Sequence, residues 1–154
     1  MALPVGARVP EFTARDQDGE TIRSHELEGR RYVLYFYPHD DTPICTRQAC
    51  AFEAARGAFD DLGVPVFGVS ANGVKSHDRF ARKHGLGFRL LADPDRALVR
   101  AFDATGLLGR ISRITYIIGP QGTIEARRKA ELSGRGHADW AREQVALLQA
   151  EAPF

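Results

Sequence analysis

The segment YVLYFY, residues 32 to 37, limits how this chain can fold more than any other feature, because it contains only aromatic and aliphatic residues. A strand with one face toward solvent alternates polar and apolar residues, whereas an unbroken apolar run is typical of a strand buried on both faces. Comparable runs follow at residues 64–71, 88–93 and 113–120. The sequence therefore predicts a sheet that other elements cover on both sides.

Helical patterns lie between these runs, at residues 43–62, 74–84 and 95–103. Strands that alternate with helices predict βαβ units and a parallel core. The segment PQGTIEARRKA then adds a turn at Gly122 and a polar strand, which predicts an antiparallel hairpin. A second hairpin is predicted around Asp18 and Gly19, and a last amphipathic helix at residues 137–149. We expect an α/β fold, with a mixed central sheet flanked by helices and an N-terminal β-hairpin, in a single domain over residues 1–154.

Composition excludes several classes of protein. A chain of 154 residues buries roughly 70% of the surface that its unfolded form exposes, so it needs no disulfide or structural metal ion to fold. No segment approaches the ~20 apolar residues of a membrane-spanning helix. The net charge of +1 gives no electrostatic reason to expect nucleic acid or an anionic membrane as a partner.

The first residues, MALPVGARVPEF, lack a basic start followed by a continuous apolar segment. A secretory signal is therefore not expected, and we predict a cytoplasmic protein. In that reducing compartment a disulfide is more often transient and catalytic than structural. The cysteines of the chain are thus candidates for chemistry.

Both cysteines lie in the segment YPHDDTPICTRQAC, residues 37 to 50. Pro38 cannot donate to a strand ladder, so it ends the apolar strand. Thr42 is a favourable N-cap and Pro43 suits the first helical position, which places Cys45 at N3. There the thiol lies near unpaired backbone N–H groups and the positive end of the helix dipole, both of which favour a thiolate. This arrangement is typical of a nucleophile.

Cys50 lies five residues further along the same predicted helix. Helix geometry separates the two residues by about 140° around the axis and roughly 8 to 9 Å between Cα atoms. A disulfide tolerates only about 4.4 to 6.8 Å. The two sulfurs therefore cannot bond while the helix is intact, and the pair implies a conformational switch.

Two other interpretations of the cysteines are a zinc site and the active site of a cysteine protease. A zinc site requires four ligands at short spacings, and His39 is the only imidazole near the cysteines. A cysteine protease requires a specific histidine beside Cys45. The remaining histidines are expected on predicted surfaces or helix ends, namely His25, His77, His84 and His137. Asp40 and Asp41 are expected to be solvated turn residues.

The string Pro38-x-x-x-Thr42-x-x-Cys45 resembles the active-site signature of the peroxiredoxins. The following Cys50 is similar to the subgroup called bacterioferritin comigratory protein or peroxiredoxin Q, whose resolving cysteine sits on the same helix. The resemblance covers most of the chain, through GARVPEFTARDQDGETI, YVLYFYPHDDTPICTRQAC, VFGVSANGVKSHDRFARKHGLGFRLLADPDRALVRAF and GRISRITYIIGPQGTI.

The resemblance implies a thioredoxin-like fold and reduction of hydrogen peroxide or organic hydroperoxides, without metal, haem or flavin. It implies that Cys45 is the peroxidatic nucleophile and Cys50 the resolving thiol. Thr42 would hold the peroxide and Pro38 would shield the pocket. Arg113 would support the thiolate and the polarised O–O bond; Arg110 is the other candidate, and Arg113 is favoured because it directly precedes a strand.

The family's chemistry further implies that the sulfenic acid at Cys45 becomes a disulfide, which thioredoxin or a similar dithiol reduces. Ile44 departs from the subgroup, where glycine is common, and Gln48 stands where glutamate is frequent. A monomer is expected, although Leu107 and Leu108 could support a weak dimer. The alternatives are a thioredoxin-like disulfide oxidoreductase, which would normally carry Cys-x-x-Cys, and a redox-sensing interaction module.

Overall fold

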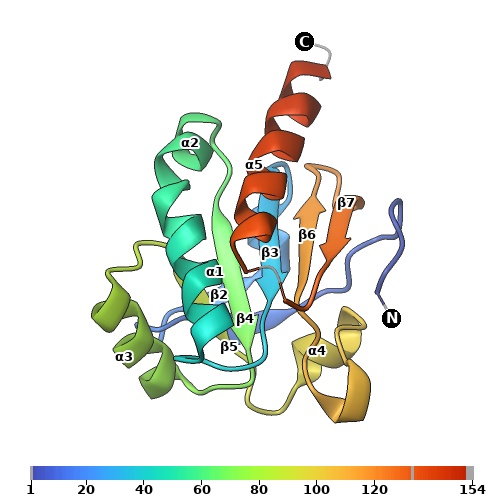
Figure 1. Cartoon of the computed structure of the whole chain (residues 1–154). Coiled ribbons are helices and arrows are strands. Elements are labelled where there is room, and N and C mark those ends of the chain that lie inside the picture. The colour runs from blue at the N-terminus through green and yellow to red at the C-terminus, as the bar shows by residue number, and fades with distance from the viewer. Residues whose placement is uncertain (1, 133, 152–154) are drawn as a thin grey trace.

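The computed structural model describes residues 2–132 and 134–151. All strands belong to one seven-stranded sheet with the order β2-β1-β5-β4-β3-β6-β7. Figure 1 shows β3, β4 and β6 at its centre. The strands are β1 Thr13–Arg15, β2 Thr21–Arg23, β3 Tyr32–Phe36, β4 Val66–Ser70, β5 Arg89–Ala92, β6 Ile114–Ile118 and β7 Ile124–Lys129.

The sheet is mixed, as the sequence predicts. β3, β4 and β5 run parallel to one another, while β6 lies antiparallel to β3 and forms a hairpin with β7. β1 and β2 form the expected N-terminal hairpin, which joins the sheet through β5. Every residue of β3 is buried, in agreement with its unbroken apolar sequence.

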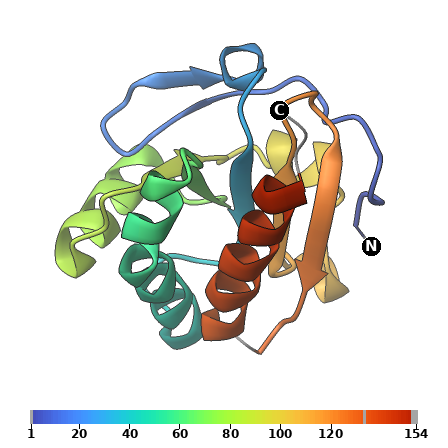
Figure 2. The same ribbon diagram turned by 90° about the horizontal axis from the view of Figure 1, so that it is seen from above.

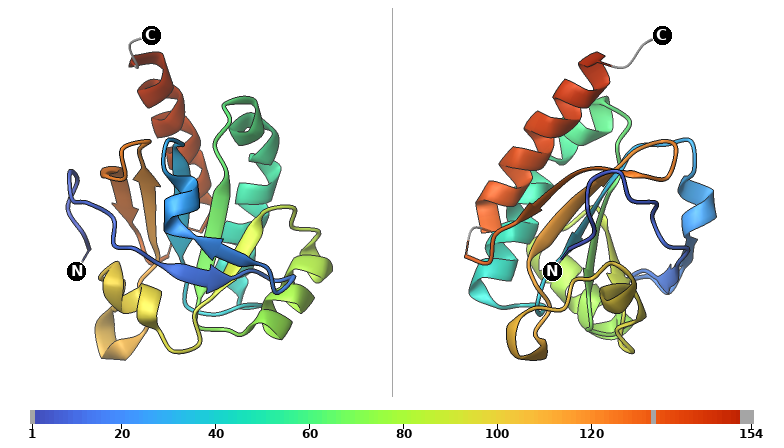
Figure 3. Two further views of the ribbon diagram at one scale, coloured as in Figure 1. Left: turned by 180° about the vertical axis from the view of Figure 1, so that it is seen from behind. Right: turned by 90° about the vertical axis from the view of Figure 1, so that its right-hand side faces the viewer.

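Two layers cover the sheet (Figures 2 and 3). The helices and 3-10 turns are η1 Ser24–Leu27, α1 Pro43–Ala54, α2 Arg56–Asp61, α3 Val74–His84, α4 Ala97–Ala101, η2 Leu107–Gly109 and α5 Gly134–Glu151. On one face, Phe52 of α1, Phe80 of α3 and Val145 of α5 pack against apolar side chains of the sheet. On the other face, Leu27 of η1 and Val99 of α4 pack with the N-terminal segment. Among the described residues, no helix is long and apolar enough to cross a membrane.

The prediction of a single helix over residues 43–62 is wrong, because the structure has two helices, α1 and α2, in this range. The chain leaves α-helical geometry at Ala55, where φ is −90° and ψ is −3°, and α2 begins at the next residue. Gly57 follows in the first turn of α2, and glycine is a poor helix former, so local propensity does little to keep the two helices joined. α1 therefore ends only four residues after Cys50.

The register of the central strands places the candidate residues together. Phe36, the last residue of β3, pairs with Ile114, the first residue of β6. Because these strands are antiparallel, the residue that precedes β6 lies beside the residue that follows β3. Arg113 is thereby brought to the loop from which α1 starts.

Candidate active site

Cys45 occupies the third position of α1, as predicted. Thr42 is the N-cap with extended backbone angles, and Pro43 is the first helical residue. The Cys45 side chain is 1% exposed and faces the core, where it joins Tyr35, Ala49 and Phe52 in one cluster. The thiol therefore lies at the positive end of a helix and at the edge of an apolar core.

The Thr42 side chain departs from its expected role as a helix cap. It makes no capping hydrogen bond, and its hydroxyl donates instead to the backbone oxygen of His39 at 3.0 Å. Its backbone oxygen accepts from Thr46 at 2.8 Å, which begins the helix. The Thr42 hydroxyl thus already donates its proton to His39, and its oxygen can still accept a further hydrogen bond.

Arg113 contacts the Cys45 sulfur directly. Its Nη1 atom donates to Cys45 Sγ at 3.3 Å and to Gln48 Oε1 at 2.6 Å, and its Nε atom donates to the backbone oxygen of Glu131 at 3.0 Å. A guanidinium is always charged, so this buried contact favours the anionic form of the sulfur. Arg110, the other candidate, is exposed.

A buried histidine supports the segment that holds Arg113. His137 was expected at a helix end, but it is fully buried, and its Nε2 atom lies 2.8 Å from the backbone oxygen of Ala130. Since a carbonyl only accepts, Nε2 carries the proton, and Nδ1 accepts from the Thr115 hydroxyl at 2.7 Å. Burial lowers the pKa of His137 to about 4, so the ring is neutral at pH 7.

An apolar groove opens beside Arg113. Its volume is about 540 Å³, and its apolar lining includes Pro38, Ile44, Leu107, Leu108 and Leu132. Leu107 and Leu108 are 85% and 91% exposed. Ile44, in place of the glycine common in similar proteins, adds an apolar wall to this groove rather than closing it.

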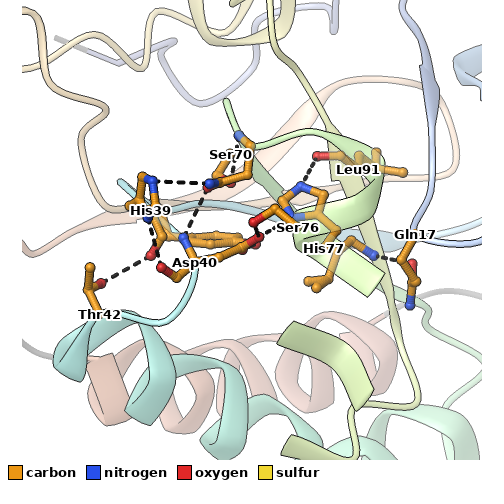
Figure 4. Close-up of polar contacts among 11 residues, drawn as sticks. Gln17, His39, Asp40, Thr42, Ser70, Ser76, His77 and Leu91 are labelled. Atoms are coloured by element: carbon orange, nitrogen blue, oxygen red, sulfur yellow. Dashed lines mark hydrogen bonds and ion pairs between the residues drawn. The ribbon is translucent and has the colours of Figure 1, made fainter. Parts of the chain in front are cut away.

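The interpretation of Asp40 as a solvated turn residue is wrong. Its carboxylate is almost completely buried and accepts from Tyr37 Oη at 2.6 Å and Ser76 Oγ at 2.8 Å. His77 Nδ1 lies 2.7 Å from the same carboxylate, and this ring too is buried rather than at the surface (Figure 4). Only Asp41 fits the original interpretation, because it is exposed at a positive φ of 62° and pairs with Lys83.

The local sequence carried no signal for this cluster. Asp40 stands between a strand and a helix cap, where aspartate is a common turn residue. Its partners Ser76 and His77 lie 36 and 37 positions away in the chain. A histidine at position i with apolar residues at i+3 and i+4 is the one available hint, since Phe80 and Ala81 place His77 on the buried stripe of α3.

Cys50 is exposed on the same intact helix, and both cysteines are free thiols. The structure therefore does not bring the two predicted redox partners together. In residues 2–132 and 134–151, no group of three or more His, Cys, Asp or Glu side chains could hold a metal ion.

Comparisons with known proteins show which family this chain resembles in sequence and in fold. Residues 5–127 match the AhpC/TSA family. The chain is 42% identical over 140 residues to peroxiredoxin Bcp of Xanthomonas campestris pv. campestris, which covers 86% of this chain and 83% of the relative. PrxQ of Xylella fastidiosa superimposes with a TM-score of 0.91 at 27% identity, covering 96% of this chain and 98% of that one.

A further similar structure is the bacterioferritin comigratory protein of Xanthomonas campestris, solved in work on its alkyl peroxide reduction activity. It has a TM-score of 0.84 at 32% identity and covers 90% of this chain and 92% of that one. These matches confirm the thioredoxin-like fold that the sequence resemblance implied.

Proposed function

This chain belongs to the AhpC/TSA family and is a thiol-dependent peroxidase, and we propose that Cys45 is its peroxidatic residue and Cys50 its resolving residue. The observation that carries the assignment is the hydrogen bond of 3.3 Å from Arg113 Nη1 to Cys45 Sγ, at the first turn of α1. A sulfur at a helix start and beside a fixed cation is stabilised as a thiolate, which is the nucleophilic form.

In the proposed first step, the Cys45 thiolate attacks the terminal oxygen of a hydroperoxide. The O–O bond breaks, the sulfur becomes a sulfenic acid, and the alkoxide leaves and takes up a proton to give an alcohol, or water from hydrogen peroxide. Arg113 stabilises both the sulfur anion and the charge that develops on oxygen. The Thr42 hydroxyl accepts from the peroxide O–H, and amides of the first turn donate to the other oxygen. Pro38, on the rim of the groove, shields the sulfur from water.

In the second step, the first turn of α1 unwinds and the Cys50 thiolate attacks the sulfenic sulfur. A disulfide forms and hydroxide leaves, which becomes water on protonation. Thioredoxin or a similar dithiol then reduces the disulfide by exchange and restores both thiols. The exposed position of Cys50 supports this order, because its sulfur can move without disturbing the core.

The groove next to Arg113 supports organic hydroperoxides as preferred substrates. Its apolar side chains can cover an alkyl chain while the peroxide group lies at Cys45. The similar protein of Xanthomonas campestris is associated with alkyl peroxide reduction. We further infer that residues 1–154 act as one domain, as a monomer and in the cytoplasm, where thioredoxin-type reductants operate.

Peroxide consumption by the purified protein, with thioredoxin, its reductase and NADPH, tests this proposal. An enzyme consumes many equivalents of peroxide, whereas a redox sensor consumes one. Treatment of the reduced protein with one equivalent should also lower its intact mass by about two units, from loss of two hydrogens as the disulfide forms. A protein that consumes peroxide without this mass change would contradict the role of Cys50.

A further inference from the structure

The loop between β3 and α1 is tied to the rest of the fold by a buried polar network around Asp40 (Figure 4). Besides the three side chains that contact the carboxylate, the backbone N–H of Asp40 donates to Asn72 Oδ1 at 3.0 Å. Asn72 in turn accepts from Ser70 Oγ at 2.8 Å, and its Nδ2 atom lies 3.1 Å from His39 Nε2. The loop is therefore held by residues at the end of β4 and at the start of α3.

The Asp40 and His77 side chains contact each other inside the protein, 2.7 Å apart. His77 Nε2 lies 3.0 Å from the backbone oxygen of Leu91, which only accepts, so this nitrogen carries a proton. Nδ1 faces Asp40 Oδ2, so one proton also lies between those two atoms. Burial by itself would raise the pKa of Asp40, but hydrogen bonds from His77, Tyr37 and Ser76 outweigh it and the pKa is lowered. The Asp40 carboxylate and the His77 ring are therefore joined by a short, buried hydrogen bond.

This network ends at the residues that would bind peroxide. Thr42, two positions after Asp40, donates to the backbone oxygen of His39, and His39 Nδ1 lies 2.8 Å from the backbone oxygen of Asp40. Cys45 follows three residues after Thr42 on α1. The position of the first helical turn thus depends on contacts to β4, α3 and β5, none of which takes part in the reaction.

We propose that Asp40 and His77 are positioning residues, which hold the loop before α1 and thereby set the equilibrium between the folded and the unwound first turn of that helix. The proposal rests on the assignment of Cys45 and Cys50 above. Attack on peroxide uses the folded turn, which is already the dominant state, whereas disulfide formation passes through the unwound state. A weaker anchor should therefore accelerate disulfide formation and change the rate of attack very little.

The test is the substitution His77→Asn, which keeps a hydrogen-bond donor toward Asp40 but removes the bond to the backbone oxygen of Leu91. We expect disulfide formation from the sulfenic acid to become about tenfold faster, the size of effect expected for one charged hydrogen bond. Oxidation of Cys45 by hydrogen peroxide should change by less than about twofold, because most molecules remain folded. The fraction of Cys45 that reaches the sulfinic acid at high peroxide should fall by a similar factor of about ten.

General damage to the site would instead slow both steps, and that result would overturn the proposal, as would an unchanged rate of disulfide formation. Ser76→Ala removes one hydrogen bond to Asp40 and keeps the contact between Asp40 and His77, so it should shift the same rates in the same direction by about threefold even if the His77 variant folds poorly. Asp78→Asn is the matched control, since Asp78 neighbours His77 on α3 but pairs only with the exposed Arg82. It should change neither rate.

A second readout does not depend on the chemistry of either cysteine. In a Cys45→Ser, Cys50→Ser background, His77→Asn should raise the hydrogen-exchange rate of amides at residues 45–48 by about tenfold. Unchanged exchange there overturns the positioning role even if the peroxidase assignment holds. Faster exchange together with an inactive wild-type protein would instead reject the peroxidase assignment and retain the anchor.

Discussion

Cys45 and Cys50 lie on the same helix and have opposite surroundings. Cys45 is 1% exposed, at the start of α1, and receives a hydrogen bond from Arg113. Cys50 is exposed and lies close to the end of α1. One sulfur thus lies among fixed contacts and the other at the surface, which fits the attacking role proposed for Cys45 and the resolving role proposed for Cys50.

Helix geometry explains why both properties occur together. Five residues of α-helix turn the side chain by about 140°, so a helix that buries one of the two positions exposes the other. The same rotation that protects Cys45 from solvent keeps Cys50 out of reach. The proposed attack and the proposed resolution would therefore require two conformations of one segment, and the following changes test this.

Cys45→Ser should abolish peroxide consumption, because serine is not ionised at neutral pH and cannot accept the oxygen as a sulfenic acid does. The NADPH-coupled assay with thioredoxin measures this loss. Any substantial residual turnover would remove the distinction between the two cysteines, since Cys50 would then be reacting with peroxide itself.

Cys50→Ser should leave the first attack unchanged and reduce thioredoxin-coupled turnover to a small fraction of the wild-type value. Without a second thiol, Cys45 remains as sulfenic acid and oxidises further. Intact mass after one equivalent of peroxide should show one added oxygen, and after excess peroxide two or three. A variant that still loses two hydrogens would point to another electron donor.

Arg113→Gln should slow oxidation of Cys45 by about 10²- to 10³-fold, the range found when one charge-stabilising donor is removed from an active site. Glutamine keeps a polar group but supplies no charge to the sulfur. Arg110→Gln is the matched control, because Arg110 lines the same groove and is exposed. Equal losses in the two variants would show that general positive charge, rather than the contact at 3.3 Å, activates Cys45.

Lowering the pH should reduce the free energy of unfolding through His137, which supports the segment that holds Arg113. Its pKa falls from 6.5 to about 4 on burial, so the unfolded chain takes up this proton at higher pH than the folded one. The contribution of His137 to the free energy of unfolding is therefore complete above pH 6.5. It is lost as the pH falls toward 4, and the loss is at most ~3 kcal/mol. Urea unfolding of the wild type and of His137→Asn at several pH values measures it. The difference between the two proteins should change across this pH range, and a constant difference would contradict the assignment.

Arg47→Gly should have the smallest effect. Arg47 is an exposed residue of α1 between the two cysteines, and glycine costs about 1 kcal/mol in a helix interior. Disulfide formation should therefore become about fivefold faster, since unwinding becomes easier. Arg47→Ala removes the same charge without this cost and should leave the rate near that of the wild type. Similar acceleration in both variants would implicate charge instead of helix stability.

The parts of the site that follow from local rules could be predicted. Pro38, Thr42 and Pro43 end a strand and begin a helix, and this alone placed Cys45 at N3 and Cys50 on the other side of the helix. The unbroken apolar sequence of β3 predicted its burial on both faces. These inferences succeeded because proline chemistry and helix periodicity act over only a few residues.

The errors arose where distant segments meet. Asp40 and His77 each resemble a surface residue in the sequence, and both are buried with hydrogen-bond partners that include each other, 37 positions apart. The burial of His137 against Thr115 likewise follows from packing between elements. Propensity describes each segment alone, so it cannot report a partner that the fold brings in later.

The amino-acid sequence by itself determined the order of strands and helices, the position of Cys45 at a helix start and the separation of Cys45 from Cys50, because backbone sterics and hydrogen bonding within one segment decide these features. Only the tertiary structure decided that Arg113 meets the sulfur across 68 residues of chain, and that Asp40 is anchored by α3 rather than by solvent. Contacts between side chains depend on how strands register and helices pack, and that geometry is set by the whole core at once.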